Sequence, residues 1–211
     1  MSGSTKGHKI DSTNRIRMFD NPFLDLLTRT HIAFPLTGFP IFSGIVIYLG
    51  VVDYGLSILE AASVFGAGFF IFTLVEYIVH RNVFHLAPTT EFRKKIQYNF
   101  HGIHHEQPKD KKRLAMPIVV STILAFVALG FFYLLMGNYS YAFTPGFVMG
   151  YATYIGVHYT VHAFAPPKNF FKILWVNHAI HHYKDDTVAY GVASPFWDVI
   201  FGTLPPKKMR S

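Results

Sequence analysis

The chain has no cysteine among its 211 residues. Disulfide frameworks, cysteine-ligated zinc or iron–sulfur sites and thiolate nucleophiles are therefore excluded. Charged residues are scarce too, at 15%, against about 25% in an ordinary soluble domain. Hydrophobic residues make up 51% of the sequence. This balance argues against a disordered chain and against an ordinary soluble domain, and it fits a small integral membrane protein.

Long stretches without charge indicate the membrane spans. Residues 30–52 and 114–167 contain no Asp, Glu, Lys or Arg. One span needs about 20 apolar residues, so the second stretch is long enough for two helices, with a turn predicted at residues 137–140. Pro35 and Pro40 are expected to kink the first span. We predict an all-α integral membrane protein with four transmembrane helices in two hairpins, at about residues 30–52, 57–86, 117–136 and 141–164.

The basic residues indicate how these spans are oriented. All 19 Lys and Arg fall in the N-terminal segment, the end of the second span, the central loop or the C-terminal segment, and the opposite turns contain none. By the positive-inside rule, both termini and the central loop are cytoplasmic. The net charge of +7 is then a topology signal and not a nucleic-acid surface.

The same pattern predicts the domain organisation. Residues 1–29 form a polar segment, in which residues 21–27 are either a short interfacial helix or part of a loosely ordered tail. Residues 30–211 form a single membrane domain. Its cytoplasmic helical cap consists of residues 87–113 and 166–211.

Histidine is unusually frequent, with 12 residues. Ten of them form four clusters: His80 and His85; His101, His104 and His105; His158 and His162; His178, His181 and His182. Spacings of three and four place side chains on one helix face, so each such cluster is expected to aim at one point. The spacing of five in the first cluster requires a helix end or a bulge. Counted along the spans at 1.5 Å per residue, all four clusters reach the same cytoplasmic edge.

Neutral imidazole is the commonest metal ligand. Ten imidazoles are too many for one ion, so we predict a dimetal site with four or five histidines on each ion and room for water or oxygen. Single histidines at a membrane edge are usually interfacial, and we interpret His8 and His31 in that way. Surface histidines could also form a pH sensor, but four clusters on one side favour the metal site.

At these residues the sequence resembles the fatty acid hydroxylase superfamily, which includes the sterol desaturases, and it is most similar to the fatty acid 2-hydroxylase branch. The matching motifs are Glu76 to His85, Phe100 to His105, Arg113-Leu114 with Pro117, Gly150 to His162, and His178 to His182 followed by Gly191 and by Trp197 to Thr203. The resemblance implies a di-iron, O2-dependent membrane monooxygenase that hydroxylates a lipid acyl chain, at the 2-position of a fatty acyl group.

The resemblance also implies cofactors and partners. The cofactors are two Fe2+ ions, which zinc can replace in a purified protein. The partners are a lipid acyl substrate, O2, membrane lipid and an electron donor. We expect the donor to be a separate cytochrome b5-like protein or ferredoxin, because the residues before the first span cannot hold a cytochrome b5 domain. We also expect a bacterial inner membrane in preference to the endoplasmic reticulum.

Four further residues are candidates for supporting roles. Glu76 lies one helical turn before His80 and either orients a ligand imidazole or pairs with Arg81. Asp198 either accepts a hydrogen bond from a ligand histidine or caps a helix. Tyr151 and Tyr154 share the face of His158 and are candidates to line the substrate pocket, with an interfacial aromatic belt as the alternative.

Three alternative functions remain open at this point. The first is a sterol or carotenoid ring hydroxylase or desaturase of the same superfamily. The second is a non-enzymatic membrane protein that binds metal or haem and carries electrons. The third is a metal transporter, which would need polar residues through the membrane middle.

Overall fold

The structure is a computed structural model that describes residues 16–210, and within that range every regular element is helical. The predicted all-α class is confirmed for these residues. The elements are α1 (Pro22–Leu27), α2 (Ala33–Val52), α3 (Ile58–Val79), η1 (His80–Phe84), α4 (Glu91–Gln97), η2 (Tyr98–Gly102), α5 (Ile103–Glu106), α6 (Ile118–Met136), η3 (Gly137–Tyr139), α7 (Ser140–Ala163), α8 (Lys172–Tyr183), α9 (Phe196–Ile200) and α10 (Lys207–Arg210).

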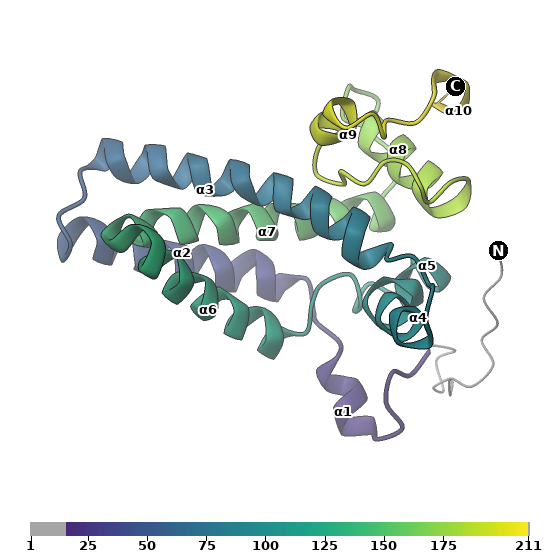
Figure 1. Ribbon diagram of the computed structural model, residues 1–211, viewed down its shortest axis with the longest axis horizontal. Coiled ribbons are helices and arrows are strands. Elements are labelled where there is room, and N and C mark those ends of the chain that lie inside the picture. Colours follow the sequence, from purple (N-terminus) through teal and green to yellow (C-terminus); the bar gives the residue numbers. More distant parts are fainter. Residues whose placement is uncertain (1–15, 211) are drawn as a thin grey trace.

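Four long helices form the body of the molecule, and α7 packs against α2, α3 and α6 (Figure 1). Glycines permit the closest approach. A Cβ atom on Gly146 of α7 would lie 2.0 Å from the Phe65 carbonyl oxygen, and one on Gly68 of α3 would lie 2.1 Å from the Phe143 carbonyl oxygen. The α3–α7 contact therefore depends on two positions without side chains.

Three segments are apolar and long enough to cross a membrane: Ala33–Val52, Ile58–Phe84 and Ile118–Ala163. The last has 46 residues and contains α6, η3 and α7. The predicted turn is found there, because Gly137 adopts a φ of 57° and ends α6. Large side chains on the outside of these helices are exposed, for example Leu59 and Leu134. A lipid environment explains that exposure, since water would oppose it.

Helix ends follow from the local sequence. The Ser57 side chain accepts from the backbone N–H of Glu60, whose carboxylate accepts from the backbone N–H of Ser57 and so completes a capping box at the start of α3. The helix α2 is continuous from residue 33 to 52 across Pro40, and Pro35 lies in its first turn, where no intrahelical donor is lost. The two prolines therefore do not interrupt this span.

The short helices gather at one end of the long ones. The elements α4 and α5 of the central loop, and α8 to α10 of the C-terminal segment, lie beyond the ends of α3 and α7 (Figure 1). The two segments predicted to form a cap are therefore at the same end of the molecule.

The predicted N-terminal segment falls partly outside the described residues, which begin at residue 16. A helix does form at the expected place, as α1, with Asn21 as its N-cap. Phe23 and Leu26 on α1 are exposed, whereas Asp25 is buried. This pattern reverses that of a water-soluble helix packed on a protein core.

Candidate metal centre

The ten clustered histidines meet where the long helices reach the cap. The ring nitrogens of nine of them form two groups, and within each group one nitrogen per residue lies within 4.8 Å of all the others. Group A consists of His104, His158, His162, His178 and His182. Group B consists of His80, His85, His101 and His181.

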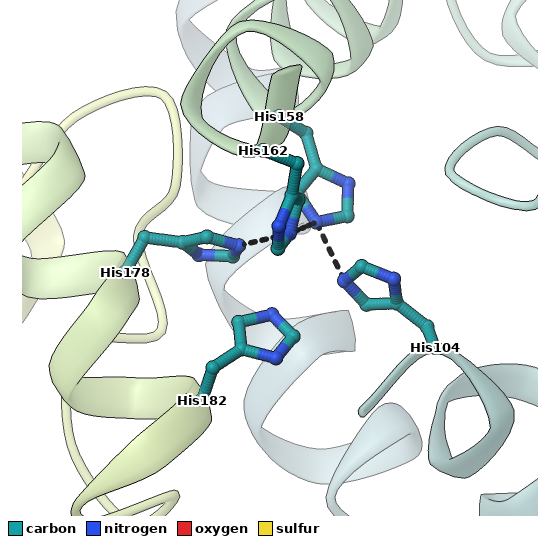
Figure 2. Close-up of side chains that lie close together, drawn as sticks. All are labelled: His104, His158, His162, His178 and His182. Atoms are coloured by element: carbon teal, nitrogen blue, oxygen red, sulfur yellow. Dashed lines mark hydrogen bonds between the residues drawn. The ribbon is translucent and has the colours of Figure 1, made fainter. Parts of the chain in front are cut away.

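Figure 2 shows group A, in which imidazoles from α5, α7 and α8 point toward one another. The Nε2 atom of His158 lies 2.9 Å from that of His104 and 3.2 Å from that of His162. The Nε2 atoms of His162 and His178 are 2.7 Å apart. Nitrogen lone pairs that face each other at such distances suit a shared cation.

Group B has the same character. The Nε2 atoms of His80 and His101 are 3.1 Å apart, and the His181 ring centroid lies 4.7 Å from that of His80 and 4.6 Å from that of His85. The predicted number of four or five histidines per group agrees with this division.

His105 belongs to neither group. Its ring stacks on that of His182 with a centroid distance of 4.2 Å, and its centroid lies 4.6 Å from that of His101. It therefore lies between group A and group B.

A π-helical turn brings His80 and His85 together. The backbone N–H of His85 donates to the carbonyl of His80, 3.1 Å away, which is the five-residue hydrogen bond of a π-helix. The ring centroids are 5.1 Å apart as a result. Of the two alternatives that the spacing of five allowed, a helix end or a bulge, the structure shows the bulge.

The two triplets do not each aim at one point, as the sequence predicted. His104 joins group A while His101 joins group B, and His181 joins group B while His178 and His182 join group A. Successive helical residues are rotated by about 100°, so the adjacent His181 and His182 leave α8 in different directions and join different groups. Each triplet therefore serves both groups.

These imidazoles are neutral because they are buried. Burial, together with the smaller effect of nearby imidazoles, lowers the pKa of His85 and of His105 to about 3. For the same reasons the pKa of His101 and that of His104 are well below 6.5. Neutral imidazole is the form that binds a metal.

Several buried nitrogens also have no hydrogen-bond partner, namely Nε2 of His85 and His181 and both ring nitrogens of His182. An unpaired buried polar atom is costly. The residues present therefore fit two metal cations, which would satisfy Nε2 of His85 and His181 and one ring nitrogen of His182.

The candidate carboxylates do not bond to histidine in the part of the chain that is described. Glu76 accepts from the backbone N–H groups of Val192 and Ala193, both at 2.9 Å. Asp198 accepts from those of Tyr190 and Gly191, also at 2.9 Å. Burial raises the pKa of Asp198, and these hydrogen bonds oppose that effect. Both carboxylates therefore bind the same loop, through the backbone N–H groups of residues 190–193.

That loop supplies acceptors which the sequence analysis missed. The Nδ1 atom of His80 donates to the Tyr190 carbonyl at 2.6 Å, and that of His181 donates to the Val188 carbonyl at 2.8 Å. Backbone carbonyls have no residue-type signature. Gly191 is the one residue in the sequence that could have pointed to a tightly packed loop here. A Cβ atom at this position would lie 2.2 Å from the Ser194 carbonyl oxygen.

The two tyrosines differ in their relation to the site. The Tyr154 ring stacks on the His158 ring, with centroids 5.6 Å apart and planes at 15°. The Tyr151 hydroxyl accepts from the backbone N–H of Met116 at 3.1 Å. Both are buried in one apolar cluster with Phe39 and Phe72. Tyr154 is thus beside group A, and Tyr151 is one helical turn farther away.

A pocket opens beside group A. Its lining includes His162, His178 and His182 together with Lys109 and Trp175. The metal site is therefore accessible from the cap side.

Comparison with known proteins agrees with this geometry. The family model described as fatty acid hydroxylase matches residues 65–203, which include all four histidine clusters. The chain belongs to the fatty acid hydroxylase family. This match confirms the family resemblance found in the sequence, and the names of the curated relatives agree with its likeness to the 2-hydroxylase branch.

Several curated relatives of this family are similar over most of the chain. The ceramide very long chain fatty acid hydroxylase of Schizosaccharomyces pombe is 37% identical over 82% of this chain and 53% of its own length. The dihydroceramide fatty acyl 2-hydroxylase FAH1 of Arabidopsis thaliana is 33% identical over 74% of this chain and 67% of its own. The human fatty acid 2-hydroxylase is 33% identical over 68% of this chain and 40% of its own length.

A solved structure has the same fold. Full-length scs7p, in which only the hydroxylase domain is visible, superposes with a TM-score of 0.81 and 31% identity over 91% of this chain and 73% of that one. The chain spans about half the length of the S. pombe relative. The relatives named with an organism are eukaryotic, so the expected bacterial membrane gains no support from them.

Proposed function

We propose that this protein is a membrane-bound, O2-dependent hydroxylase that uses two iron ions to hydroxylate a lipid acyl chain at the 2-position. The observation that carries the proposal is the pair of convergent imidazole groups at one end of an apolar helical bundle. The names of the relatives, which are ceramide and fatty acyl hydroxylases, support the choice of substrate class. The names of these relatives mention neither a sterol nor a carotenoid, so the ring hydroxylase alternative has no comparable support.

Group A and group B would each hold one iron ion, and zinc is expected to occupy the same nitrogens in an iron-poor preparation. Bound iron supplies the redox chemistry that activates O2 toward an unactivated C–H bond. The protein holds neutral imidazoles in place for it. His105, the tenth histidine of the clusters, lies near both groups and in neither, so we propose that it neighbours the ligands without binding either ion.

The apolar residues beside group A would bind the acyl chain. Tyr154 lies against His158 and is buried in the cluster that contains Phe39 and Phe72. A chain lying there would be shielded from water and held near the metals. Tyr151 would line the same path one turn farther from the site. Tyr154, Glu76 and Asp198 are the proposed supporting residues.

In the membrane, we propose that α2, α3, α6 and α7 cross the bilayer as two hairpins. Residues 30–211 would form one domain, with the cap and both termini in the cytoplasm, where the basic residues lie. The exposed Phe23 and Leu26 would rest α1 on the membrane surface. A separate cytochrome b5-like protein or ferredoxin would supply electrons from the cap side.

Metal analysis combined with acyl-chain mass spectrometry tests this function. Cells that express the wild-type chain should gain 2-hydroxy acyl chains, and the purified protein should contain two metal ions. His181→Ala removes one nitrogen of group B and should abolish the gain of oxygen. His31→Ala, outside both groups, should leave it unchanged. Lipids that do not differ between the expressing and the empty cells would contradict the proposed activity.

A further inference from the structure

The loop of residues 188–193 contacts two ligand imidazoles from behind. His80 and His181 donate through Nδ1 to the carbonyls of Tyr190 and Val188, at 2.6 and 2.8 Å. Their Nδ1 atoms therefore carry the protons, and their Nε2 atoms are free to bind metal. Such a hydrogen bond fixes both the tautomer and the orientation of a ligand histidine. Two of the four imidazoles in group B are set by this one loop.

Two buried carboxylates hold the loop in turn. Asp198 and Glu76 together accept from four successive backbone N–H groups, those of residues 190 to 193. The Thr203 hydroxyl donates to the Oδ1 atom of Asp198 at 2.7 Å. Hydrogen bonds to a carboxylate are stronger than neutral ones, and all of these except the part-buried one from Ala193 are buried away from water. The loop cannot shift without breaking several of them.

The backbone of the loop is also constrained. Ala189 has a φ of 58°, a conformation that residues with a side chain rarely adopt. Its backbone N–H donates to the Thr203 carbonyl at 2.9 Å. Gly191 has no room for a side chain, because a Cβ would lie 2.8 Å from the Oδ2 atom of Asp198. Such a conformation persists only where the surroundings determine it.

Group A has no such support from this loop. Among residues 16–210, no hydrogen bond joins the loop to a histidine of group A, and His104, His158, His162 and His178 are linked through their Nε2 atoms to one another. A change in the loop should therefore reach one group and leave the other in place.

From these contacts we propose that the loop of residues 188–193 positions the ligands of group B alone, and that Asp198 and Glu76 are positioning residues which act through it. The inference rests on the proposed function, since it assumes that both groups hold iron. Neither carboxylate would touch a metal or the substrate. Their effect would pass through the Tyr190 and Val188 carbonyls to His80 and His181.

Mössbauer spectroscopy on protein loaded with isotopically enriched iron tests the proposal. The wild type should show two sites of equal area. Asp198→Asn places an amide donor against the loop N–H groups, so one site should lose its signal or change its quadrupole splitting while the other is unchanged. Total iron should fall by up to half. Asp53→Asn makes the same chemical change at an exposed position between α2 and α3 and should alter neither site.

A milder pair of variants covers the case in which Asp198→Asn does not fold. Thr203→Val removes the hydroxyl that donates to Asp198, and Thr203→Ser retains it. Valine should perturb the same single site, and serine should restore the wild-type spectrum. Equal loss of both sites, or no change in either, would overturn the positioning role. A wild-type protein without two iron sites would instead contradict the proposed function, so the two failures can be told apart.

Discussion

At the scale of single residues, the two groups are built from matching parts. Each group takes histidines from the end of a long helix and from the triplet that follows it, and one histidine from the other triplet. His105 occupies the place in the first triplet that His182 occupies in the second. His182 belongs to group A, whereas His105 belongs to neither group, so the two triplets differ at this one position.

This difference predicts unequal effects of two neighbouring substitutions. His101→Ala removes one of four nitrogens from group B and should reduce bound metal from two ions to about one per chain. His105→Ala removes a nitrogen outside both groups and should leave about two. Metal content of the purified variants, measured by elemental mass spectrometry, checks this. Equal losses would show that His105 is a fifth ligand of group B.

At the scale of elements, the contact between α3 and α7 is governed by glycine. The long helices carry no ion pairs to each other among the described residues, so their association depends on close packing. His80 follows α3 directly and His158 lies on α7, and both project into the site. If these helices separated, His80 of group B and His158 of group A would move apart.

Gly146→Ala should destabilise the protein by roughly 1–3 kcal/mol, the usual cost of overpacking. Its Cβ would lie 2.0 Å from the Phe65 carbonyl oxygen, which belongs to the backbone and cannot move aside alone. Gly130→Ala on α6 is the matched control, because nothing lies within 4 Å of its Cβ. Thermal unfolding in detergent measures both, and similar midpoints would contradict the packing argument.

A second element-scale contact ties residues 16–30 to the central loop. Asp25 pairs with Arg29 and with Arg113, both at 2.8 Å, and Gln107 accepts from the backbone N–H of Ile16 at 3.0 Å. Burial alone would raise the pKa of Asp25, but the hydrogen bonds from Met18, Arg113 and Arg29 outweigh it and hold the pKa below 3.8. The pairing is therefore complete at neutral pH and is lost only as the pH falls below 3.8.

Asp25→Ala should release this segment at neutral pH, because the buried Arg113 loses the carboxylate that it pairs with at 2.8 Å, and Asp110 is farther away, at 3.7 Å. Limited proteolysis should then cut within residues 16–30 at least several-fold faster than in the wild type. Asp53→Ala, at an exposed aspartate between α2 and α3, serves as the control. Equal cleavage rates for the two variants would show that Asp25 does not hold the segment.

At the scale of the whole molecule, the apolar exterior and the one-sided basic charge together predict how the protein lies in a bilayer. The turn at η3 is at the end of the bundle away from the cap (Figure 1). With four crossings, η3 and the cap face opposite sides of the membrane. With a single crossing by residues 118–163, the ends of that segment would instead lie on opposite sides.

The absence of native cysteine makes this topology directly testable. Asn138→Cys and Lys184→Cys should each react with a membrane-impermeant maleimide from one side only, and from opposite sides. Both positions lie outside the two histidine groups, so metal content should be retained. Labelling of both cysteines from the same side would contradict the four-span arrangement.

The helical class, the apolar segments and the ten clustered histidines could be predicted from the sequence alone, and the spacing of His80 and His85 limited that site to a helix end or a bulge. These features depend on composition and on spacing along one helix, which are local properties. The division of the triplets between two groups could be seen only in the folded chain, because the direction of an imidazole depends on how its helix is placed against the others. The tertiary structure also decided that Glu76 and Asp198 bind a loop rather than a histidine, because a backbone carbonyl becomes an acceptor only where folding places it.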